Sequence, residues 1–349
     1  MNSEIFLVCP NCRITLTREN RKLRCPSCGE NWAIEKNVPW FSRSSRYWGE
    51  IDQPSMQKLN RLAREDGWES ALHQVAPQLG NYVTSPSRTH WTTLLPLKPD
   101  WTALDIGAGW GGNSFPLSER LRQVVALEAV LERAEFMEIR REQTARNNLQ
   151  VVAASIHEMP LPNEAFNLVV MNGMLEWVAL SAPGDPGRIQ ANILRRVHEL
   201  LDVDGWLYLG IENRFSFESF LGEQDDSGMP FASLMPRKMA DFYMHWASPR
   251  HNRTHGTMAS YRTYTYSYWG YQRLLERCGF KDFQAWGTYS YNRPKLLFSL
   301  KDASEFKQYL EGRSSASRRK KLLHFLASKG ASRRLLRLFS PAFCIVARR

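Results

Sequence analysis

The middle of the chain is organised as short apolar runs separated by longer amphipathic segments. The first run, Trp101–Ile106, leads into a glycine-rich turn, and a helical pattern follows the turn. A second run, Val124–Glu128, ends on a carboxylate. Runs without polar alternation are typical of strands buried on both faces of a parallel sheet. Upstream, Ser55–Arg64 and Trp68–Val75 have the spacing of short amphipathic helices.

The turn after the first run contains three alternating glycines, Gly107, Gly109 and Gly111. Glycine lets the backbone turn sharply off a strand and approach a bound nucleotide without a Cβ in the way. Together with the helix N-terminus behind it, the turn predicts a cofactor cradle. The residues fit both the GxGxxG pattern of dinucleotide sites and a GxGxG pattern. The pattern by itself therefore leaves two cofactor classes open.

Two carboxylates favour S-adenosylmethionine (SAM) over a dinucleotide. Asp105 lies within the end of the first strand, where a dinucleotide site usually has a small apolar residue and a SAM site can use an acid near the methionine ammonium. Glu128 lies 21 residues after Gly107, about the spacing at which an acid can hold ribose hydroxyls. A plain strand-to-helix turn is the alternative, and Glu128 makes it the weaker interpretation.

With these residues the chain resembles the class I SAM-dependent methyltransferases, in particular the small domains that act on metabolites, lipids and glycans. The resemblance covers about residues 82–300, and its most specific part is the sequence LDIGAGWG at 104–111. Residues 151–160, 165–172 and 201–211 match later strands and loops of that fold. The resemblance implies a Rossmann-like α/β fold, mostly parallel, with an antiparallel C-terminal hairpin from residues 283–289 and 295–300.

The resemblance also implies which residues bind SAM. The chain departs from the usual pattern at Ser155 and Asn167, where Asp is common, and at Trp177, where many relatives have His. The serine hydroxyl can still form a hydrogen bond. The cofactor-binding residues implied in this way are Asp105, Gly107, Ala108, Gly109, Gly111, Glu128, Ser155, Ile156 and Asn172.

Four of the six cysteines lie near the N-terminus, as two CxxC pairs: Cys9, Cys12, Cys25 and Cys28. This spacing predicts a structural Zn²⁺ site with four thiolate ligands. Two disulfides are the alternative, but they need an oxidising compartment that nothing else in the sequence indicates. The segment resembles the small zinc-ribbon proteins that activate tRNA, rRNA and protein methyltransferases. Its role is either to stabilise the catalytic domain, which we favour, or to recruit a substrate or partner.

Candidate catalytic residues follow the fifth predicted strand. Glu212 lies at the carboxyl end of that strand, where open α/β sheets place ligands. A segment rich in aromatic residues and arginine follows it and contains Arg214, His245 and Tyr264. Glu212 and His245 are predicted bases for an acceptor that must lose a proton, and Arg214 and Tyr264 are predicted to orient it. Solvated or core roles are the alternatives for each of these side chains.

Composition fits an intracellular enzyme. The chain has 349 residues, of which 43% are hydrophobic and 23% charged, enough for a full core and two or three structural units. No apolar run has the length needed to cross a bilayer. The first residues lack the features of a signal peptide. We therefore expect a cytoplasmic protein.

The C-terminal residues carry the charge excess. Eleven Lys and Arg residues and no acidic ones follow Glu311, and the whole chain has a formal net charge of +11. Apolar residues between these charges predict a basic amphipathic helical tail. Such a tail over 313–349 suits an anionic membrane at its inner face, RNA or an acidic partner. A helix packed on the catalytic domain with a solvated basic face is the equally favoured alternative.

The sequence therefore predicts a SAM-dependent methyltransferase that modifies an O or N atom of a small-molecule, lipid-linked or glycan acceptor. An RNA methyltransferase that uses the ribbon and the tail is one alternative, and a non-catalytic SAM-binding adaptor is another. The predicted organisation is a zinc ribbon at 1–41, a linker with cap helices at 42–80, a methyltransferase domain at 81–300 with a substrate insertion at 212–267, and the basic tail at 301–349.

Overall fold

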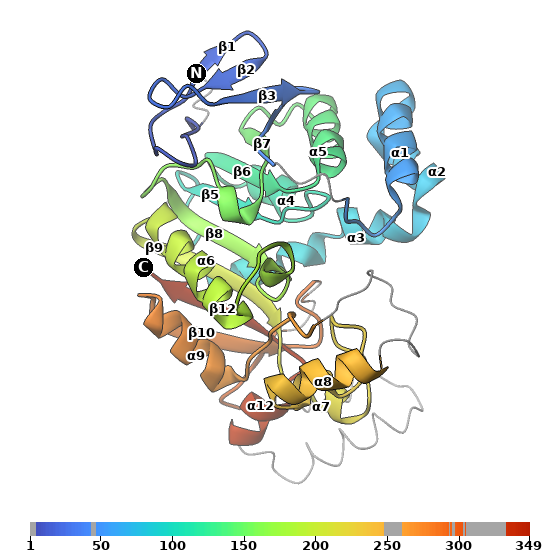
Figure 1. The fold of residues 1–349 in the computed structure, drawn as a ribbon. Coiled ribbons are helices and arrows are strands. Elements are labelled where there is room, and N and C mark those ends of the chain that lie inside the picture. Colours follow the sequence, from blue (N-terminus) through green and yellow to red (C-terminus); the bar gives the residue numbers. More distant parts are fainter. Residues whose placement is uncertain are drawn as a thin grey trace. The chain divides into compact units, whose positions relative to one another are not determined.

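The fold was analysed in a computed structural model, which describes residues 5–42, 47–247, 260–292, 294, 297–302, 304 and 333–349. The chain forms two compact units (Figure 1). The first unit comprises residues 1–171, 199–207 and 349, and the second comprises residues 172–198 and 208–348. Each unit is described by itself below.

The first unit is built around parallel strands whose side chains are buried on both faces. Strand β5 pairs with β6 and with β8, and β6 pairs with β7, always in parallel. Every residue of β5 and β6 is buried, which explains why both strands read as continuous apolar runs. The predicted parallel α/β fold is confirmed here. The strands are β5 (Thr102–Ile106), β6 (Gln123–Glu128), β7 (Leu149–Ala153) and β8 (Phe166–Asn172).

The N-terminal residues extend this sheet. Four short strands form an antiparallel series in the order β1-β2-β3-β4. The last of them, β4, pairs in parallel with β7 through Trp40 and Ala153. We call residues 5–41 the four-cysteine ribbon. Its strands are β1 (Thr17–Glu19), β2 (Lys22–Arg24), β3 (Asn31–Glu35) and β4 (Val38–Trp40).

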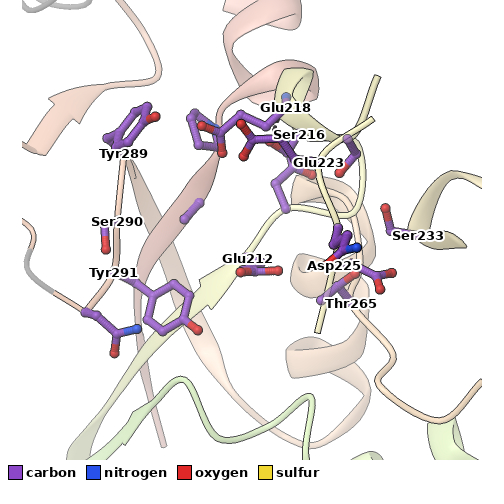
Figure 2. Close-up of a pocket in the computed structure, with 16 residues that line it drawn as sticks. Glu212, Ser216, Glu218, Glu223, Asp225, Ser233, Thr265, Tyr289, Ser290 and Tyr291 are labelled. Carbon is purple, nitrogen blue, oxygen red and sulfur yellow. Dashed lines mark hydrogen bonds between the residues drawn. The ribbon is translucent and has the colours of Figure 1, made fainter. Parts of the chain in front are cut away.

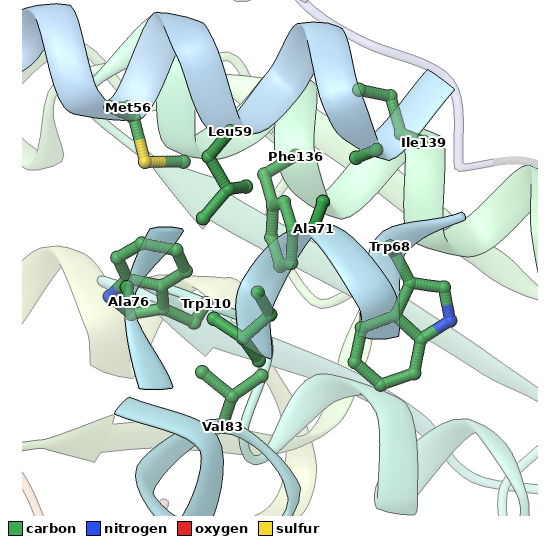
Figure 3. Packing of buried hydrophobic residues seen from close by; sticks show 11 residues of the cluster. Met56, Leu59, Trp68, Ala71, Ala76, Val83, Trp110, Phe136 and Ile139 are labelled. Carbon is green, nitrogen blue, oxygen red and sulfur yellow. The ribbon is translucent and has the colours of Figure 1, made fainter. Parts of the chain in front are cut away.

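Helices that precede the first parallel strand pack on the glycine turn. Met56 and Leu59 of one helix point toward Phe136 of another, and Trp110 from the turn packs against the same ring (Figure 3). The Trp110 and Phe136 ring centroids are 5.3 Å apart in an edge-to-face arrangement, which is a favourable aromatic geometry. The helices of this unit are α1 (Gln53–Asp66), α2 (Trp68–Val75), α3 (Gly80–Thr84), α4 (Ser114–Ser118) and α5 (Leu131–Gln143).

In the second unit the strand order is β9-β12-β10-β11. Strand β9 (Leu201–Glu212) begins in the first unit and enters the second at Tyr208. Strand β10 (Lys281–Thr288) pairs antiparallel with both β11 (Leu297–Ser299) and β12 (Ala342–Arg348). The predicted antiparallel hairpin is present, and a further strand pairs with it.

That further strand, β12, lies where the sequence predicts the end of a helical tail. Its residues from Ala342 to Ala347 are all buried, and the run includes the β-branched Ile345 and Val346, which favour strands. A short apolar run does not by itself distinguish a buried strand from a buried helix. Most of the basic tail, residues 305–332, lies outside the described residues.

The remaining helices of the described chain belong to the second unit, except that α6 ends in the first. They are α6 (Pro186–Leu200), α7 (Phe217–Phe220), α8 (Arg237–Ala247), α9 (Tyr268–Arg277) and α12 (Arg333–Phe339). A small apolar cluster joins α8 to the loops around it, through Met229, Ala240, Met244 and Tyr261. No helix within the described residues is long and apolar enough to cross a membrane.

Candidate functional site

The glycine turn of the first unit, residues 107–112, is here called the glycine loop. Gly107, Gly109 and Gly111 all have positive φ, at 69°, 60° and 79°, a region that other residues adopt only with strain. A Cβ on Gly109 would lie 2.4 Å from Nη2 of Arg133. The loop therefore requires glycine for both its backbone conformation and the space around it.

Glu128 anchors this loop at the end of β6. One carboxylate oxygen accepts a hydrogen bond from the Gly109 amide at 2.8 Å, and the other accepts one from Val130 at 3.0 Å. The buried guanidinium of Arg133 lies 3.7 Å from Glu128 and 3.8 Å from Glu50. Glu128 thus lies beside the loop, and its charge is balanced by an arginine.

Asp105 lies at the other end of the same turn and is fully buried. Its carboxylate accepts a hydrogen bond from the Ser114 hydroxyl at 2.6 Å. Burial raises the pKa of Asp105 to about 6, although the Ser114 hydrogen bond and the charge of Arg88 act in the opposite direction. The carboxyl group of Asp105 is thus buried next to the loop, with Arg88 as a nearby opposite charge.

Arg88 is a residue that the sequence analysis missed. Only 6% of its surface is exposed, and its Nε and Nη1 atoms have no hydrogen-bond partner among the described residues. It packs against the glycine loop, because a Cβ on Gly112 would lie 2.3 Å from its Nε. Its guanidinium also stacks on Tyr82 at 4.2 Å. Unpaired buried donors are costly, so this arginine is suited to bind an anionic group. No motif in the sequence pointed to this arginine, which lies in the short helical turn Pro86–Leu94.

The other implied cofactor residues have structural contacts of their own. The Ser155 hydroxyl accepts a hydrogen bond from the His157 amide at 3.3 Å and so caps a short helical turn that contains Ile156. Asn172 belongs to the second unit, where its Oδ1 lies 3.4 Å from the Tyr208 hydroxyl. Its Nδ2 is buried without a partner among the described residues, so it has a free donor.

Asn167 and Trp177, the two other departures from the family pattern, lie in different units of the chain. Asn167 accepts a hydrogen bond from the Thr102 amide at 2.9 Å and links neighbouring strands of the first unit. Trp177 lies in the second unit, just before a short helical turn, and its amide bonds the carbonyl of Met174. Asn167 therefore has a structural contact where the family usually has an acid.

The four cysteines of the ribbon converge. Their sulfur atoms all lie within 4.8 Å of one another, and the sulfurs of Cys9 and Cys28 are 3.8 Å apart. Four thiolates at about 2.3 Å from one Zn²⁺ would be about 3.8 Å apart. The Cys12 and Cys28 amides point at the sulfurs of Cys9 and Cys25, at 3.3 and 3.5 Å. The cysteine chemistry and spacing thus fit a tetrahedral metal site.

The second unit contains a pocket at the carboxyl end of β9. Figure 2 shows Glu212 with Tyr291 on one side and Asp225 on the other, and Glu218 and Glu223 beyond them. Its volume is about 160 Å³. No Lys, Arg or His is among the described residues that line it. The lining residues are Glu212, Asn213, Ser216, Glu218, Ser219, Glu223, Gln224, Asp225, Ser233, Thr265, Tyr289, Ser290, Tyr291, Asn292, Pro341 and Ala342.

The carboxyl groups at this pocket have perturbed pKa values. Burial raises the pKa of Glu212 well above its ordinary value, and the nearby charges of Asp226, Asp225 and Glu218 raise it further. Burial also raises the pKa of Asp225. Behind the pocket wall, burial raises the pKa of Glu176 to about 8, while a hydrogen bond from Tyr291 acts in the opposite direction. Such shifts often mark functional sites.

Of the predicted catalytic residues, Glu212 lines this pocket and the other three do not. Arg214 donates hydrogen bonds to the carbonyls of Ser233 and Met235, both at 2.8 Å. Tyr264 stacks on Tyr261 with ring centroids 5.7 Å apart, and His245 is exposed on α8.

Two more histidines that the sequence suggests as bases, His251 and His255, lie outside the described residues. Sequence reasoning also missed the acids that surround Glu212. Glu218, Glu223 and Asp225 follow it within a short stretch of the predicted insertion. This local excess of acidic residues could have indicated that they lie near Glu212.

Comparison with known proteins identifies one domain. Residues 104–209 match the model of a family described as a methyltransferase domain. A comparison with curated proteins finds no match. The match covers the glycine loop, Glu128 and most of the strands from β5 to β9, and these strands have the parallel order expected for a class I methyltransferase. The predicted fold and the prediction of a methyltransferase enzyme are therefore confirmed for this domain.

Several solved structures are similar to the chain at low identity. A Haemonchus contortus phosphoethanolamine N-methyltransferase 2 is 11% identical with a TM-score of 0.45, and the match covers 86% of this chain and 61% of that one. The chain thus spans about three fifths of that protein's length. A SAM-dependent methyltransferase from Aquifex aeolicus is 16% identical, with a TM-score of 0.40 and coverage of 68% and 93%. A cyclopropane synthase from Mycobacterium tuberculosis is 16% identical, with a TM-score of 0.42 and coverage of 75% and 82%.

Proposed function

We propose that the chain is a SAM-dependent methyltransferase that methylates an O or N atom of a small molecule, or of a small group on a lipid-linked or glycan acceptor. The observation that carries the proposal is the glycine loop, which has three positive-φ glycines and is bonded to Glu128 inside a methyltransferase domain. The acceptor binds in the second-unit pocket. Bound SAM supplies an electrophilic methyl group, so the protein contributes mainly position and exclusion of water.

The first unit has a suitable group for each polar part of SAM. Each Glu128 oxygen accepts one amide hydrogen bond and keeps a further lone pair for a ribose hydroxyl. The unpaired Nε and Nη1 of Arg88 would bind the methionine carboxylate. Asp105 provides negative charge for the methionine ammonium. Ser155 and Ile156 would border the adenine.

We also propose that Cys9, Cys12, Cys25 and Cys28 hold a structural Zn²⁺, because their sulfurs converge to within 4.8 Å. The ribbon then supports the edge of the parallel sheet. The Val8 and Phe41 amides bond the carbonyls of Pro160 and Ala153, at 2.9 and 2.7 Å. These carbonyls flank Ser155 and Ile156, so a folded ribbon would hold the proposed adenine segment in place.

An RNA acceptor is disfavoured by the charge of the pocket. Four carboxylates line it, and phosphates would be repelled by them. The basic tail that suits RNA or an anionic membrane lies mostly outside the described residues. A small acceptor fits the acidic pocket better.

Titration calorimetry of SAM against the wild type, Glu128→Gln and Glu119→Gln tests the cofactor assignment. We expect the wild type to bind SAM and Glu128→Gln to bind it about 10-fold to 100-fold more weakly, because a charged hydrogen-bond acceptor is lost. Glu119 is exposed and pairs with Arg146, so its variant controls for charge removal and should bind like the wild type. A wild-type protein that does not bind SAM would contradict the proposal.

A further inference from the structure

We propose that Glu50 is a positioning residue of the cofactor site, which holds Arg133 away from Glu128 and so leaves the Glu128 carboxylate available to the ribose hydroxyls of SAM. This role rests on the methyltransferase function proposed above and adds to it a residue that sets the recognition of ribose. All three residues belong to the first unit.

The position of Arg133 is the first support. Its guanidinium lies between two carboxylates at nearly equal distances: Nη2 is 3.7 Å from Oε2 of Glu128, and Nη1 is 3.8 Å from Oε2 of Glu50. Both distances are longer than a charge-assisted hydrogen bond, which measures about 2.7–2.9 Å. The arginine is therefore divided between the two acids and is not fully paired with either.

The surroundings of Arg133 leave these two carboxylates as the main forces on it. Its Nε is buried without a partner in the described part of the chain, and its guanidinium faces the Trp48 ring at 5.2 Å. Burial by itself would lower the pKa of Arg133, but the charges of Glu128 and Glu50 raise it above its ordinary value. The attraction of the two carboxylates therefore decides where the guanidinium lies.

Glu50 is itself held in place beside the glycine loop. Its Oε2 accepts a hydrogen bond from the indole N–H of Trp110 at 2.8 Å. Trp110 belongs to the apolar cluster shown in Figure 3, and Tyr47 and Ile51, which flank Glu50, pack against the same cluster. The Tyr47 hydroxyl also donates a hydrogen bond to the Ile51 carbonyl at 2.8 Å. These contacts fix the position of the Glu50 charge.

Glu128 needs free lone pairs for its proposed contact with ribose. Its two oxygens already accept hydrogen bonds from the amides of Gly109 and Val130. A carboxylate has about four lone-pair sites, so about two remain for the ribose hydroxyls. An arginine often pairs with a carboxylate through two parallel hydrogen bonds, and such a pair with Arg133 would occupy those sites. Glu50 opposes this pairing because it attracts the same guanidinium from the other side.

The location of these charges at the glycine loop is the second support. A Cβ on Gly109 would lie 2.4 Å from Nη2 of Arg133, so the guanidinium packs directly on the loop. Movement of the guanidinium toward Glu128 would therefore take place where the cofactor is proposed to bind. A change at Glu50 should thus reach the cofactor through Arg133 and Glu128.

Calorimetric titration of the full-length protein with SAM and with its 2′,3′-dideoxy analogue separates this role from a structural one. We expect the wild type to prefer SAM by about 10-fold or more, because the ribose hydroxyls donate to a charged acceptor. In Glu50→Gln the amide oxygen can still accept the Trp110 hydrogen bond, but the charge is lost. The preference should fall below about 3-fold, with the affinity for the analogue within about 2-fold of the wild type. Equal weakening of both ligands would indicate a structural role and overturn the proposal.

A double variant tests the part played by Arg133. Arg133→Met in the Glu50→Gln background removes the competing guanidinium, so the preference for SAM should return to within about 2-fold of the wild-type value. A preference that stays low in the double variant would overturn the proposal. Glu65→Gln removes an exposed acid of α1 and is the charge control, which should keep the wild-type preference.

The wild type itself separates a failure of this proposal from a failure of the function on which it rests. A wild type that does not bind SAM would contradict the methyltransferase function. A wild type that binds SAM and the dideoxy analogue equally would leave that function standing, but it would overturn the ribose contact of Glu128 and this proposal with it.

Discussion

Two groups of carboxylates in this protein, one buried and one half-buried, have different surroundings. In the first unit, Glu128 accepts two amide hydrogen bonds beside Arg133, and Asp105 accepts one from Ser114. In the second unit, Glu212 has no described partner and lies among further acids. Carboxylates that accept hydrogen bonds from backbone amides fix the conformation of a loop. A carboxylate without such bonds does not. We infer that the first group is preorganised for its cofactor.

The largest effect should come from removing the proposed metal site of the first unit. Cys25→Ser removes one of the four proposed zinc ligands and should abolish zinc binding. Structural zinc contributes about 10 kcal/mol or more to the stability of such small modules. We expect the ribbon to unfold and SAM affinity to fall, since the ribbon bonds the carbonyls of Ala153 and Pro160. Zinc content by mass spectrometry and calorimetric unfolding measure this. Cys278→Ser, at a buried cysteine of the second unit, is the control and should keep its zinc.

The next effect should come from the glycine loop itself. Gly109→Ala places a Cβ 2.4 Å from Arg133 at a φ of +60°, so we expect SAM binding to weaken about 100-fold. Gly67 also has a positive φ, +90°, but no described atom lies within 4 Å of its added Cβ. Gly67→Ala should therefore lose about 1 kcal/mol of stability and bind SAM normally. Equal SAM affinities for the two variants would show that the close packing at Gly109 is not needed.

Arg88 offers a smaller and more specific test of preorganisation. If its unpaired nitrogens bind the methionine carboxylate, the wild type should prefer SAM to decarboxylated SAM by about 10-fold or more. Arg88→Met should bind the two compounds equally. Calorimetric titration with both ligands measures the preference. A preference that survives in Arg88→Met would assign the carboxylate to another residue.

The smallest effect that we expect is a change in the pH dependence of unfolding, caused by Glu176 in the second unit. The pKa of Glu176 is raised to about 8 in the folded protein, so the folded state binds a proton more tightly than the unfolded state does. The free energy of unfolding should therefore fall as pH rises from about 4.5 to about 8. Glu176→Gln should reduce this fall and be more stable than the wild type above pH 8. Denaturant unfolding across this pH range measures it, and a variant with the wild-type slope would exclude the effect.

Much of the first unit could be predicted from local sequence. The glycines, Asp105 and Glu128 belong to short strands and a tight turn, where neighbouring residues decide the backbone and the side-chain type decides the chemistry. The cysteine pairs are equally local, because each CxxC knuckle brings two sulfurs together. Arg88 was missed because its burial depends on packing against Gly112, which no sequence pattern reports.

The second unit shows what local sequence leaves open. Glu212 was predicted from its place at a strand end, but its acidic surroundings arise from loops that fold around it. Arg214 and Tyr264 are directed to backbone carbonyls and to another ring, which the aromatic and arginine content did not reveal. The chain end was predicted to be helical and forms β12, whose place in the sheet comes from pairing with β10.

The sequence by itself determined the methyltransferase domain and its parallel fold and predicted a metal-ligand set, because each depends on residue types at fixed short spacings. Only the tertiary structure decided which acids share a pocket and which of them lack a partner. It also decided that Arg88 has free donors at the glycine loop. The burial of a charged side chain and its hydrogen-bond partners depend on segments that are far apart in the sequence. These contacts decide what the side chain can do.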